Sequence, residues 1–445
     1  MTLQMEDTHA AIHTRSLTWA LVFLLLTGAT LQAYPQAAGR ISFNDDWMFY
    51  LDQPNNGRGN SWRRLSLPHD WSIELPFDST SPAGTGGGAL NGGVGWYYKS
   101  FKTPENADGK KVFIDFEGVY CNSTVWINGR LLGSRPNGYI SFRYDLTPYL
   151  RKEENNLLIV KVDNSRQPNS RWYSGSGIYR NVWLTVCNPL HIAHWGAYVT
   201  TAPIRGKDNL LPQKQADIRM ETVVENESDT RETVTLATIV YNADGKPVKQ
   251  VKSQRSVPAQ SRLTIKEQFQ IDDPVYWSVE NPYLYKIVSA VIKDGKATDV
   301  YHTPLGIRSF YFDRQKGFFL NGKPLRIRGV CEHHDLGCLG AAFNRSAALR
   351  RLRLLKDMGV NAIRTAHNPP APGLLELCDQ MGFLVMDEAF DMWKKGKNKY
   401  DYHLYWNQWY RQDLEDLIRR DRNHPSVIIW SIGNEIPEQW KAQGG

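Results

Sequence analysis

Strand-like and helix-like segments alternate along the C-terminal third of this chain of 445 residues. Short apolar runs predict four strands, at residues 325–330, 362–365, 383–386 and 427–430. Helical spacing of apolar residues predicts three helices between them, at residues 346–358, 372–381 and 409–422. This alternation is typical of a parallel sheet with crossover helices. Because an eight-stranded barrel needs roughly 250 residues, about twice what is left after Asp313, we expect half of a (β/α)8 barrel.

Polar side chains follow each of these four predicted strands. They are His333, His334 and Asp335 after the first, Arg364 and His367 after the second, Asp387 and Glu388 after the third, and Asn434 and Glu435 after the fourth. Barrel enzymes place their catalytic groups at these strand ends. The mixture of imidazole, guanidinium, amide and carboxylate groups suits a ligand with many hydroxyl groups. We predict no metal or other cofactor, because no HExxH-like spacing and no glycine-rich phosphate loop accompanies them.

The N-terminal two thirds of the chain read as two all-β modules. Residues 34–192 contain short alternating runs, and Asn128-Gly129 is a strong signal for a two-residue hairpin turn. Many short strands without helical periodicity predict a β-sandwich of the jelly-roll type. Residues 193–308 repeat this pattern over about a hundred residues, which fits an immunoglobulin-like β-sandwich. We therefore predict a multidomain protein in which residues 309–445 form the partial barrel.

Eight segments carry a resemblance to one known family. They are LPHDW (67–71), FEGV (116–119), VWINGRLLG (125–133), SRWYSGSGIYRNVW (170–183), GVCEHHDLGCLG (329–340), NAIRTAHNPP (361–370), FLVMDEAFDMW (383–393) and RDRNHPSVIIWSIGNE (420–435). With these segments the chain resembles glycoside hydrolase family 2, the family of β-galactosidases and β-glucuronidases. The resemblance covers nearly all of the chain after residue 33, and it implies the same three-part architecture.

The resemblance also implies roles for the residues at the strand ends. Glu435 is expected to be the general acid/base, and Asn434 is expected to hold the 2-hydroxyl of the sugar. The other substrate-binding residues implied are His333, Arg364, His367, Asp387 and Glu388. In some large β-galactosidases of the family the position of Glu388 also touches a magnesium ion. The family keeps its nucleophile on a later strand, so a polypeptide of these 445 residues alone is expected to be inactive.

The reaction implied is retaining hydrolysis of terminal β-linked sugars from an oligosaccharide or glycan, in which two carboxyl groups lie about 5–5.5 Å apart. FLVMDEAFDMW and HHDLGCLGAA favour a β-galactosidase, and a β-glucuronidase is the alternative. A non-catalytic carbohydrate-binding protein, built from two β modules and a vestigial barrel, stays open as a different class of function. Glycan binding without hydrolysis separates that hypothesis from an enzyme.

One aromatic segment of the first β module admits two interpretations. Trp172 and Tyr173, with Arg171 and Arg180 nearby, either frame a sugar pocket from outside the barrel or pack within the module. Aromatic side chains are more often structural than functional, and the sequence leaves both interpretations open.

The net charge of +7 does not indicate a nucleic-acid partner. Lys and Arg are spread along the chain among Asp and Glu, without a clustered basic motif. The one dense cluster, at residues 394–399, is interpreted as a solvated loop.

The five cysteines match no disulfide or zinc spacing, and we predict free thiols, including Cys331 and Cys338. Assembly into a homo-oligomer is compatible with the sequence.

The N-terminus has the pattern of an export signal. Leu17 to Ala29 is apolar and too short to span a bilayer comfortably, and Ala33 offers a small residue for cleavage. We expect residues 1–33 to be removed, no stable membrane insertion after that, and a periplasmic or extracellular protein.

Mass spectrometry of the exported protein tests this expectation. We expect its first residue to lie close to Tyr34. A cytoplasmic protein that still begins at Met1 or Met5 would contradict it.

Overall fold

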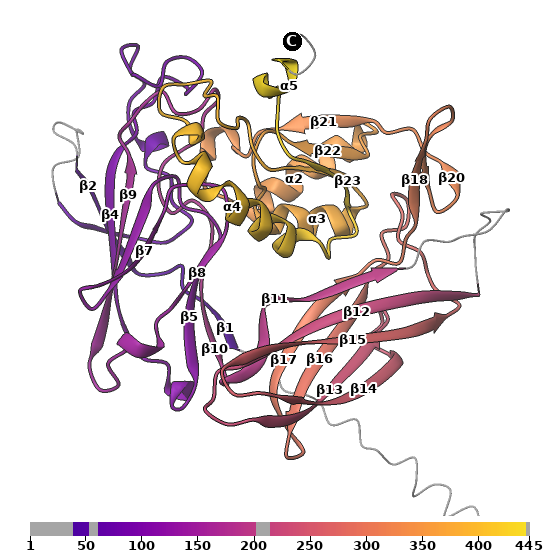
Figure 1. Ribbon diagram of the computed structural model, residues 1–445. Helices are drawn as coiled ribbons and strands as arrows, with labels where there is room; N and C mark the ends of the chain where they lie inside the picture. The colour runs from indigo at the N-terminus through magenta and orange to yellow at the C-terminus, as the bar shows by residue number, and fades with distance from the viewer. Residues whose placement is uncertain (1–38, 53–60, 202–213, 442–445) are drawn as a thin grey trace, which may run out of the picture. The chain divides into compact units, whose positions relative to one another are not determined.

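The computed structural model describes residues 39–52, 61–201 and 214–441. They form two antiparallel β modules followed by a parallel β/α unit (Figure 1). The predicted export signal lies outside the described residues. Within these ranges no helix is both long and apolar enough to cross a membrane.

Two antiparallel sheets make up the first module. The six-stranded sheet runs in the order β3 (Arg63–Leu65), β2 (Trp47–Asp52), β4 (Gly93–Lys102), β9 (Asn155–Asn164), β6 (Ser123–Ile127) and β7 (Arg130–Arg135). The four-stranded sheet runs in the order β1 (Gly39–Ser42), β10 (Val182–Cys187), β5 (Lys111–Phe116) and β8 (Phe142–Asp145). Short 3-10 turns connect them: η1 (Ser72–Glu74), η2 (Glu105–Ala107) and η3 (Thr147–Tyr149).

The inner faces of these sheets enclose one apolar core. Its largest side chains include Trp47, Trp71 and Tyr97, all fully buried. The predicted hairpin is confirmed between β6 and β7, where Asn128 and Gly129 both have positive φ angles of 49° and 80°. Two consecutive positive φ angles are the signature of a type I′ turn, whose twist matches that of the strands it joins.

The second module is a smaller sandwich. One sheet has the order β11 (Leu190–Thr201), β12 (Gln215–Asn226) and β15 (Ser261–Asp272). The other has the order β14 (Pro247–Val257), β13 (Glu232–Tyr241), β16 (Tyr285–Lys293) and β17 (Lys296–Leu305). Its buried residues alternate along the strands, as in β12 and β15, which is the pattern of a sheet with one face in a core.

The parallel unit begins after a small sheet of β18 (Phe310–Asp313), β19 (Gly317–Leu320) and β20 (Lys323–Pro324). Its four parallel strands are β21 (Gly329–Glu332), β22 (Ala362–Thr365), β23 (Leu384–Glu388) and β24 (Val427–Ser431). Its helices are α2 (Arg345–Asp357), α3 (Pro372–Met381), α4 (Trp406–Asp421) and α5 (Pro437–Lys441), with the 3-10 turns η4 (Gly337–Leu339) and η5 (Tyr402–Leu404). Within the described residues, β21 and β24 are the outer strands of this sheet.

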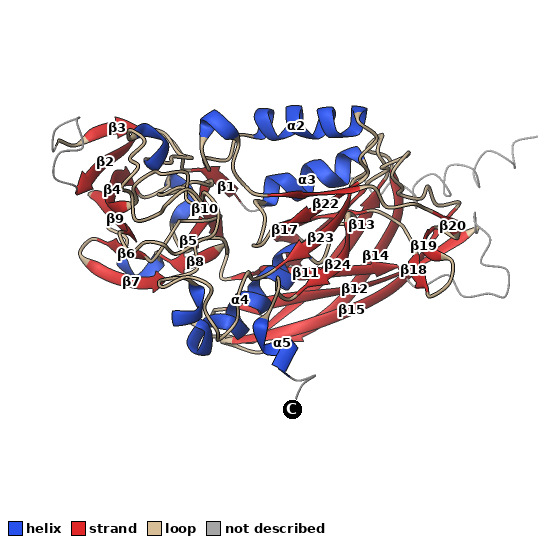
Figure 2. Cartoon of the chain, turned by 90° about the horizontal axis from the view of Figure 1, so that it is seen from above, coloured by secondary structure: helices blue, strands red, loops and turns tan. Residues whose placement is uncertain are grey.

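The two faces of the parallel sheet pack against different partners. Ile363, Val385 and Val427 meet the apolar sides of α2 and α3, which lie side by side in Figure 2. Ala362, Leu384 and Ile428 point to the opposite face, where the β18–β20 sheet closes one end. Successive side chains of a strand point to opposite faces. The residues two and four positions after Ala362 or Leu384 on the same strand therefore also point into the barrel interior.

Two sequence predictions for this unit needed correction. The first strand begins at Gly329 rather than at residue 325, because Leu325 bonds back to Phe318 in the small sheet. The helix at residues 346–358 is predicted from the spacing of Leu352, Leu354, Leu355 and Met358, but the buried face of α2 holds Ala348 and Leu352, and Leu354 and Met358 are exposed. Leu352 and Leu354 are two residues apart and therefore do not share a helix face.

A buried carboxylate of the first module fastens it to the parallel unit. Asp70 accepts hydrogen bonds from the Tyr173 hydroxyl (2.5 Å), from the backbone N–H of Ser176 (2.8 Å) and from that of Ala341 (2.8 Å). Ala341 lies in the segment between β21 and α2, so this one side chain joins segments 271 residues apart. Burial raises the pKa of Asp70, and these donors act against that rise.

Replacing Asp70 with Ala should lower the stability of the chain by roughly 2–4 kcal/mol, because several buried donors lose their acceptor. Asp108→Ala is the control, since it removes only an exposed ion pair with Lys152. Urea unfolding followed by tryptophan fluorescence should show an earlier first transition for the Asp70 variant and no change for the control. Equal midpoints for the two variants would contradict the fastening role.

Candidate functional site

Residues from three of the parallel strands converge at the carboxyl end of the sheet. Arg364 lies within β22, Glu388 ends β23, and Asn434 follows β24. Arg364 occupies the same face as Ala362, and Glu388 the same face as Leu384. Both side chains therefore enter the barrel interior.

Glu388 is the centre of one half of this site. Its carboxylate is almost fully buried and accepts two-pronged hydrogen bonds from Arg364 (2.9–3.0 Å), one from Ser431 (2.6 Å) and one from His367 Nδ1 (2.6 Å). Burial by itself raises the pKa of this carboxyl, but the bonds from His367, Ser431 and Arg364 outweigh it and hold the pKa below its ordinary value. Glu388 is therefore a fixed negative charge rather than a proton donor.

Asp391 is the centre of the other half. Its buried carboxylate accepts hydrogen bonds from Arg171 (2.6 and 3.0 Å), from Asn434 Nδ2 (2.9 Å) and from Lys397 Nζ (3.0 Å). Burial raises its pKa, yet these bonds lower it below the ordinary value overall. Asn434 joins the two halves, because its Oδ1 accepts a bond from Arg364 Nη2 (2.8 Å).

Arg171 brings the first β module into the site. The residue lies between β9 and β10, and its guanidinium spans Asp391 and Glu435, with 3.4 Å between Nη1 and Glu435 Oε2. Trp172 also reaches the site, where its ring stacks on His333 at 4.9 Å between centroids and meets His367 edge-on at 5.4 Å. The interpretation that this segment frames the site from outside the barrel agrees with these contacts.

Tyr173 and Arg180 have different surroundings. Tyr173 bonds to Asp70, as described above. Arg180 is fully buried and donates to the backbone carbonyls of Tyr139 (2.7 Å), Pro369 (2.9 Å) and Pro370 (3.1 Å). Arg180 thus supports the loop that follows β22, and Tyr173 supports Asp70, which holds the segment after β21.

The two histidines after β21 are held in neutral form. Burial, and then the charge of neighbouring His367, lower the pKa of His333. Burial lowers the pKa of His334 to about 3, and its Nε2 lies 3.1 Å from the Ser174 carbonyl oxygen. A neutral imidazole has one donor and one acceptor nitrogen. The donor of His333 bonds to the Ala366 backbone, which leaves the acceptor without a partner among the described residues.

Glu435 differs from the other carboxylates because it is open to solvent. Its side chain is 62% exposed, and the ion pairs it makes within the described part of the chain are both to Oε2: Arg171 at 3.4 Å and Lys397 at 4.0 Å. Its backbone has a φ of 44°, in the left-handed region that a glutamate seldom adopts. Asn434, immediately before it, is anchored through its side chain, its N–H to the Phe390 carbonyl (2.9 Å) and its own carbonyl to Lys397 (2.8 Å).

Asp387 lies apart from this group, contrary to the sequence prediction of a substrate-binding role. It shares the face of Val385, which packs against the helices, and it is fully buried. Burial and the nearby charge of Asp421 raise its pKa well above the ordinary value. The reason is the two-residue period of a strand, which sends adjacent Asp387 and Glu388 to opposite faces.

Sequence reasoning missed three members of the site. Asp391 lies within FLVMDEAFDMW but was given no role, and Ser431 lies inside the WSIGNE stretch. Lys397 was interpreted as part of a solvated loop, whereas its side chain is only 11% exposed and binds Asp391. Its neighbours Lys394, Lys395 and Lys399 are exposed, so residue type alone could not single it out.

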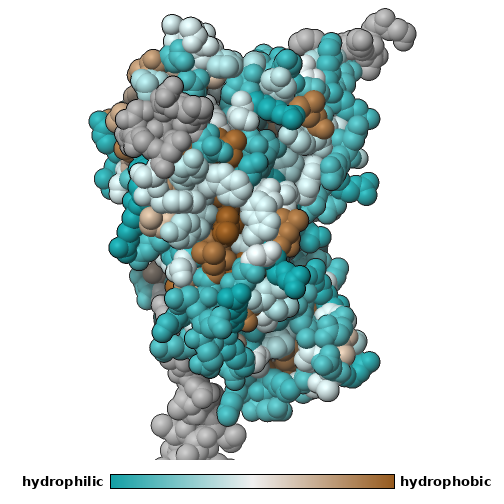
Figure 3. Space-filling model, turned by 90° about the vertical axis from the view of Figure 1, so that its left-hand side faces the viewer, coloured by the Kyte–Doolittle hydropathy of each residue, from teal (hydrophilic) through white to brown (hydrophobic). Residues whose placement is uncertain are grey.

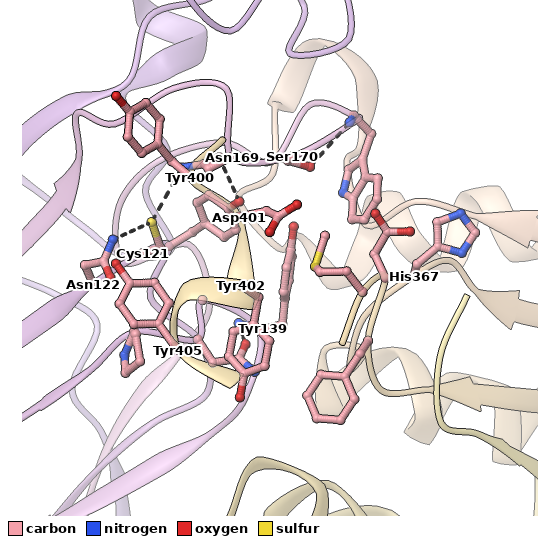
Figure 4. Close-up of a pocket in the computed structure, with 18 of the residues that line it drawn as sticks. Cys121, Asn122, Tyr139, Asn169, Ser170, His367, Tyr400, Asp401, Tyr402 and Tyr405 are labelled. Atoms are coloured by element: carbon pink, nitrogen blue, oxygen red, sulfur yellow. Dashed lines mark hydrogen bonds between the residues drawn. The ribbon is translucent and has the colours of Figure 1, made fainter. Parts of the chain in front are cut away.

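A cavity extends from the site toward the first β module. Trp172, His367 and Asp391 form its wall on the side of the site. Five tyrosines line much of the remainder: Tyr120, Tyr139, Tyr400, Tyr402 and Tyr405. Figure 4 shows His367 at one end of this cavity and Cys121, Asn122 and Tyr405 at the other. The five cysteines are free, as predicted, and burial raises the pKa of Cys121.

The geometry does not favour a cation at Glu388. Both of its oxygens are already taken by Arg364, His367 and Ser431, which leaves none for the magnesium contact that the resemblance implies in some large β-galactosidases. Among the described residues, no three His, Cys, Asp or Glu side chains are grouped so that they could share a metal ion.

Three models of one family match the chain. They are the sugar binding domain of glycosyl hydrolases family 2 at residues 41–187, a second family 2 model at residues 203–308, and the family 2 TIM barrel domain at residues 313–443. These matches confirm the predicted architecture of a sugar-binding β-sandwich, an immunoglobulin-like sandwich and a partial barrel.

Individual relatives agree with the family models. The β-galactosidase BoGH2A of Bacteroides ovatus is 53% identical over 90% of this chain and 47% of its own length. A β-glucuronidase of Formosa agariphila is 33% identical over 88% of this chain and 42% of its own. The crystal structure of a family 2 member from Bacteroides cellulosilyticus has a TM-score of 0.84 and 38% identity over 90% of this chain and 52% of its own. The chain thus spans about half the length of these relatives.

Proposed function

We propose that this chain, which belongs to glycoside hydrolase family 2, is the part of a retaining β-glycosidase that carries the general acid/base, Glu435. The observation that carries this proposal is the anchoring of Asn434 by both Arg364 and Asp391. That anchoring fixes the backbone from which Glu435 projects at the carboxyl end of the parallel sheet.

The backbone of Glu435 supports the same conclusion. A non-glycine residue at positive φ costs free energy and persists where the surroundings enforce it, which is common in active sites. Here the enforcing contacts are those of the preceding Asn434. They set where the Glu435 carboxyl can lie, while the carboxyl itself stays accessible to a bound glycoside.

Bond cleavage needs a proton on the leaving oxygen and negative charge near the anomeric carbon. Glu435 would supply the proton and then act as base toward water. Glu388 and Asp391 are already neutralised by Arg364, Arg171 and Lys397, so we assign them positioning roles. The nucleophile would come from the remainder of the barrel, about 5–5.5 Å from Glu435 in a retaining enzyme.

The remaining polar groups suit a neutral sugar. Neutral His333 and the Asn434 amide would bind hydroxyl groups, and the Trp172 ring would limit the sugar on the side of the first β module. We propose a terminal β-galactoside as substrate, supported by the 53% identity to a β-galactosidase. A β-glucuronide is the second candidate, supported by the glucuronidase relative. Lys397 and Arg171 are bound to Asp391, which argues against them as partners for a sugar carboxylate.

The place of action is also a proposal. The apolar N-terminal segment favours export, and an oligosaccharide or glycan outside the cytoplasm is then the natural substrate. A non-catalytic carbohydrate-binding role would instead give binding without turnover in a polypeptide that carries the whole barrel.

Replacing Glu435 with Ala in a polypeptide that carries the whole barrel tests the acid/base assignment. Hydrolysis of alkyl β-galactosides should fall by about 10²–10⁴, as is typical when general acid catalysis is lost. Aryl galactosides with good leaving groups should lose less in the first chemical step, because they need little protonation. Steady-state and burst kinetics on both substrates measure the difference.

Glu376→Ala is the matched control, since Glu376 is an exposed carboxylate on α3 that pairs with Arg345. It should leave both activities unchanged. Equal losses on good and poor leaving groups after the Glu435 change would show that Glu435 does not transfer the proton. Turnover of β-glucuronides instead of β-galactosides would select the second candidate.

A further inference from the structure

Lys397 differs from the other lysines of its loop. Lysine side chains usually lie at the surface, among hydrophilic residues such as those that border the face in Figure 3. The side chain of Lys397 is 11% exposed, whereas Lys394, Lys395 and Lys399 are exposed. An ammonium group that loses its hydration on burial needs hydrogen-bond partners in return. Two of the partners of Lys397 lie in the segment that carries Glu435.

Three oxygen atoms lie around the Lys397 ammonium. Its Nζ donates to the backbone carbonyl oxygen of Asn434 (2.8 Å) and to Oδ1 of Asp391 (3.0 Å), and it lies 4.0 Å from Oε2 of Glu435. The Asp391 carboxylate also accepts two hydrogen bonds from Arg171, so it keeps a cation without the lysine. The bond to the Asn434 carbonyl has a different effect, because it holds a peptide group in one orientation.

That peptide group sets the backbone conformation of Glu435. A peptide group is planar, so turning the Asn434 carbonyl also turns the N–H of Glu435 and changes the φ angle there. The φ angle of Glu435 is 44°, and holding a residue other than glycine in this region costs free energy. A peptide group that was free to turn would relax toward negative φ and carry the Glu435 side chain in another direction. The bond from Lys397 opposes this rotation.

A buried carboxylate shapes the loop that presents Lys397. Asp401 is 1% exposed. It accepts hydrogen bonds from three backbone N–H groups of the loop, those of Lys397 (2.8 Å), Asn398 (2.6 Å) and His403 (3.1 Å). The backbone from which the Lys397 side chain extends is therefore fixed within the loop.

The same loop bonds to the segment after β24 on both sides of Glu435. The indole N–H of Trp393 donates to the carbonyl oxygen of Ile432 (2.9 Å), which precedes Glu435. The backbone N–H of Lys395 donates to Oε1 of Glu438 (2.7 Å), which follows it. The loop and the acid/base segment are thus held together at both ends, and Lys397 adds a contact between these two points.

We propose that Lys397 is a positioning residue for the acid/base, because its bond to the Asn434 carbonyl keeps Glu435 at positive φ. The inference rests on the acid/base role proposed for Glu435, but the effect on the backbone does not depend on catalysis. The alternative is that Lys397 only balances the charge of Asp391. Removing it would then leave the Glu435 backbone in place, since Arg171 and Asn434 still bond to Asp391.

Crystal structures of the wild type and of Lys397→Met test the backbone effect, both in a polypeptide that carries the whole barrel. Methionine fills a similar volume but has no charge and donates no hydrogen bond. The variant should show the Asn434 carbonyl turned and Glu435 at negative φ. A positive φ in both structures, or a negative φ in the wild type, would overturn the proposal. This result decides the role of Lys397 even if Glu435 proves not to be the acid/base.

Kinetics on the same polypeptides test the consequence for the reaction. Lys397→Met should lower kcat for alkyl β-galactosides by about 10–100-fold, less than the loss of the carboxyl itself. The KM should change by less than about threefold, because the effect is on the transferred proton and not on sugar binding. Aryl galactosides with good leaving groups should lose less. Lys397→Arg keeps a cation and donor groups and should recover part of the activity.

A second comparison separates positioning from a structural role. In a Glu435→Gln background, Lys397→Met should lower kcat by less than about twofold, because no acid is left to position. A full second loss there would contradict the proposal, and so would a Lys397→Met protein that does not fold. Lys394→Met is the matched control, since Lys394 is an exposed lysine of the same loop. It should leave kcat, KM and the thermal unfolding midpoint unchanged.

Discussion

The buried carboxylate of Asp391 is the interaction on which the rest of the site depends. A carboxylate loses its hydration on burial and stays ionised only when paired and hydrogen-bonded. Asp391 meets that requirement with Arg171 from the first β module, Lys397 from the segment before α4 and Asn434 from the end of β24. Three distant segments are therefore held together by the need to compensate one charge.

The first β module is consequently part of the site rather than an appendage to it. Arg171 and Trp172 supply contacts that the barrel strands do not provide. Arg180 donates hydrogen bonds to the loop after β22, and Asp70 accepts one from the segment after β21. Removing the module would leave Asp391 with a partly unpaired buried charge, so binding and stability are coupled across the interface.

The sequence allowed the order of the four parallel strands and the strand ends at which polar side chains converge to be predicted. The apolar runs around Ile363 and Val385 were sufficient to predict β22 and β23, because strands that pack against helices need apolar side chains. The direction of the Asp387 side chain was not predicted. Side chains alternate between the two faces of a strand, so this direction depends on which residue begins β23. Lys397 was misjudged, and the sequence could not decide between the two interpretations of Arg180. The partner of Lys397 is a side chain that local spacing does not reveal, and the partners of Arg180 are backbone carbonyls, which no sequence pattern records.

A double-mutant cycle between Arg171 and Asp391 tests most directly whether the two modules build one site. The kcat/KM for nitrophenyl β-galactoside would be measured for Arg171→Ala, Asp391→Asn and the double variant, in a polypeptide that carries the whole barrel. We predict a coupling free energy of about 0.5–3 kcal/mol, so that the double variant loses less than the two single losses combined. Strictly additive losses would contradict a site shared between the sandwich and the barrel.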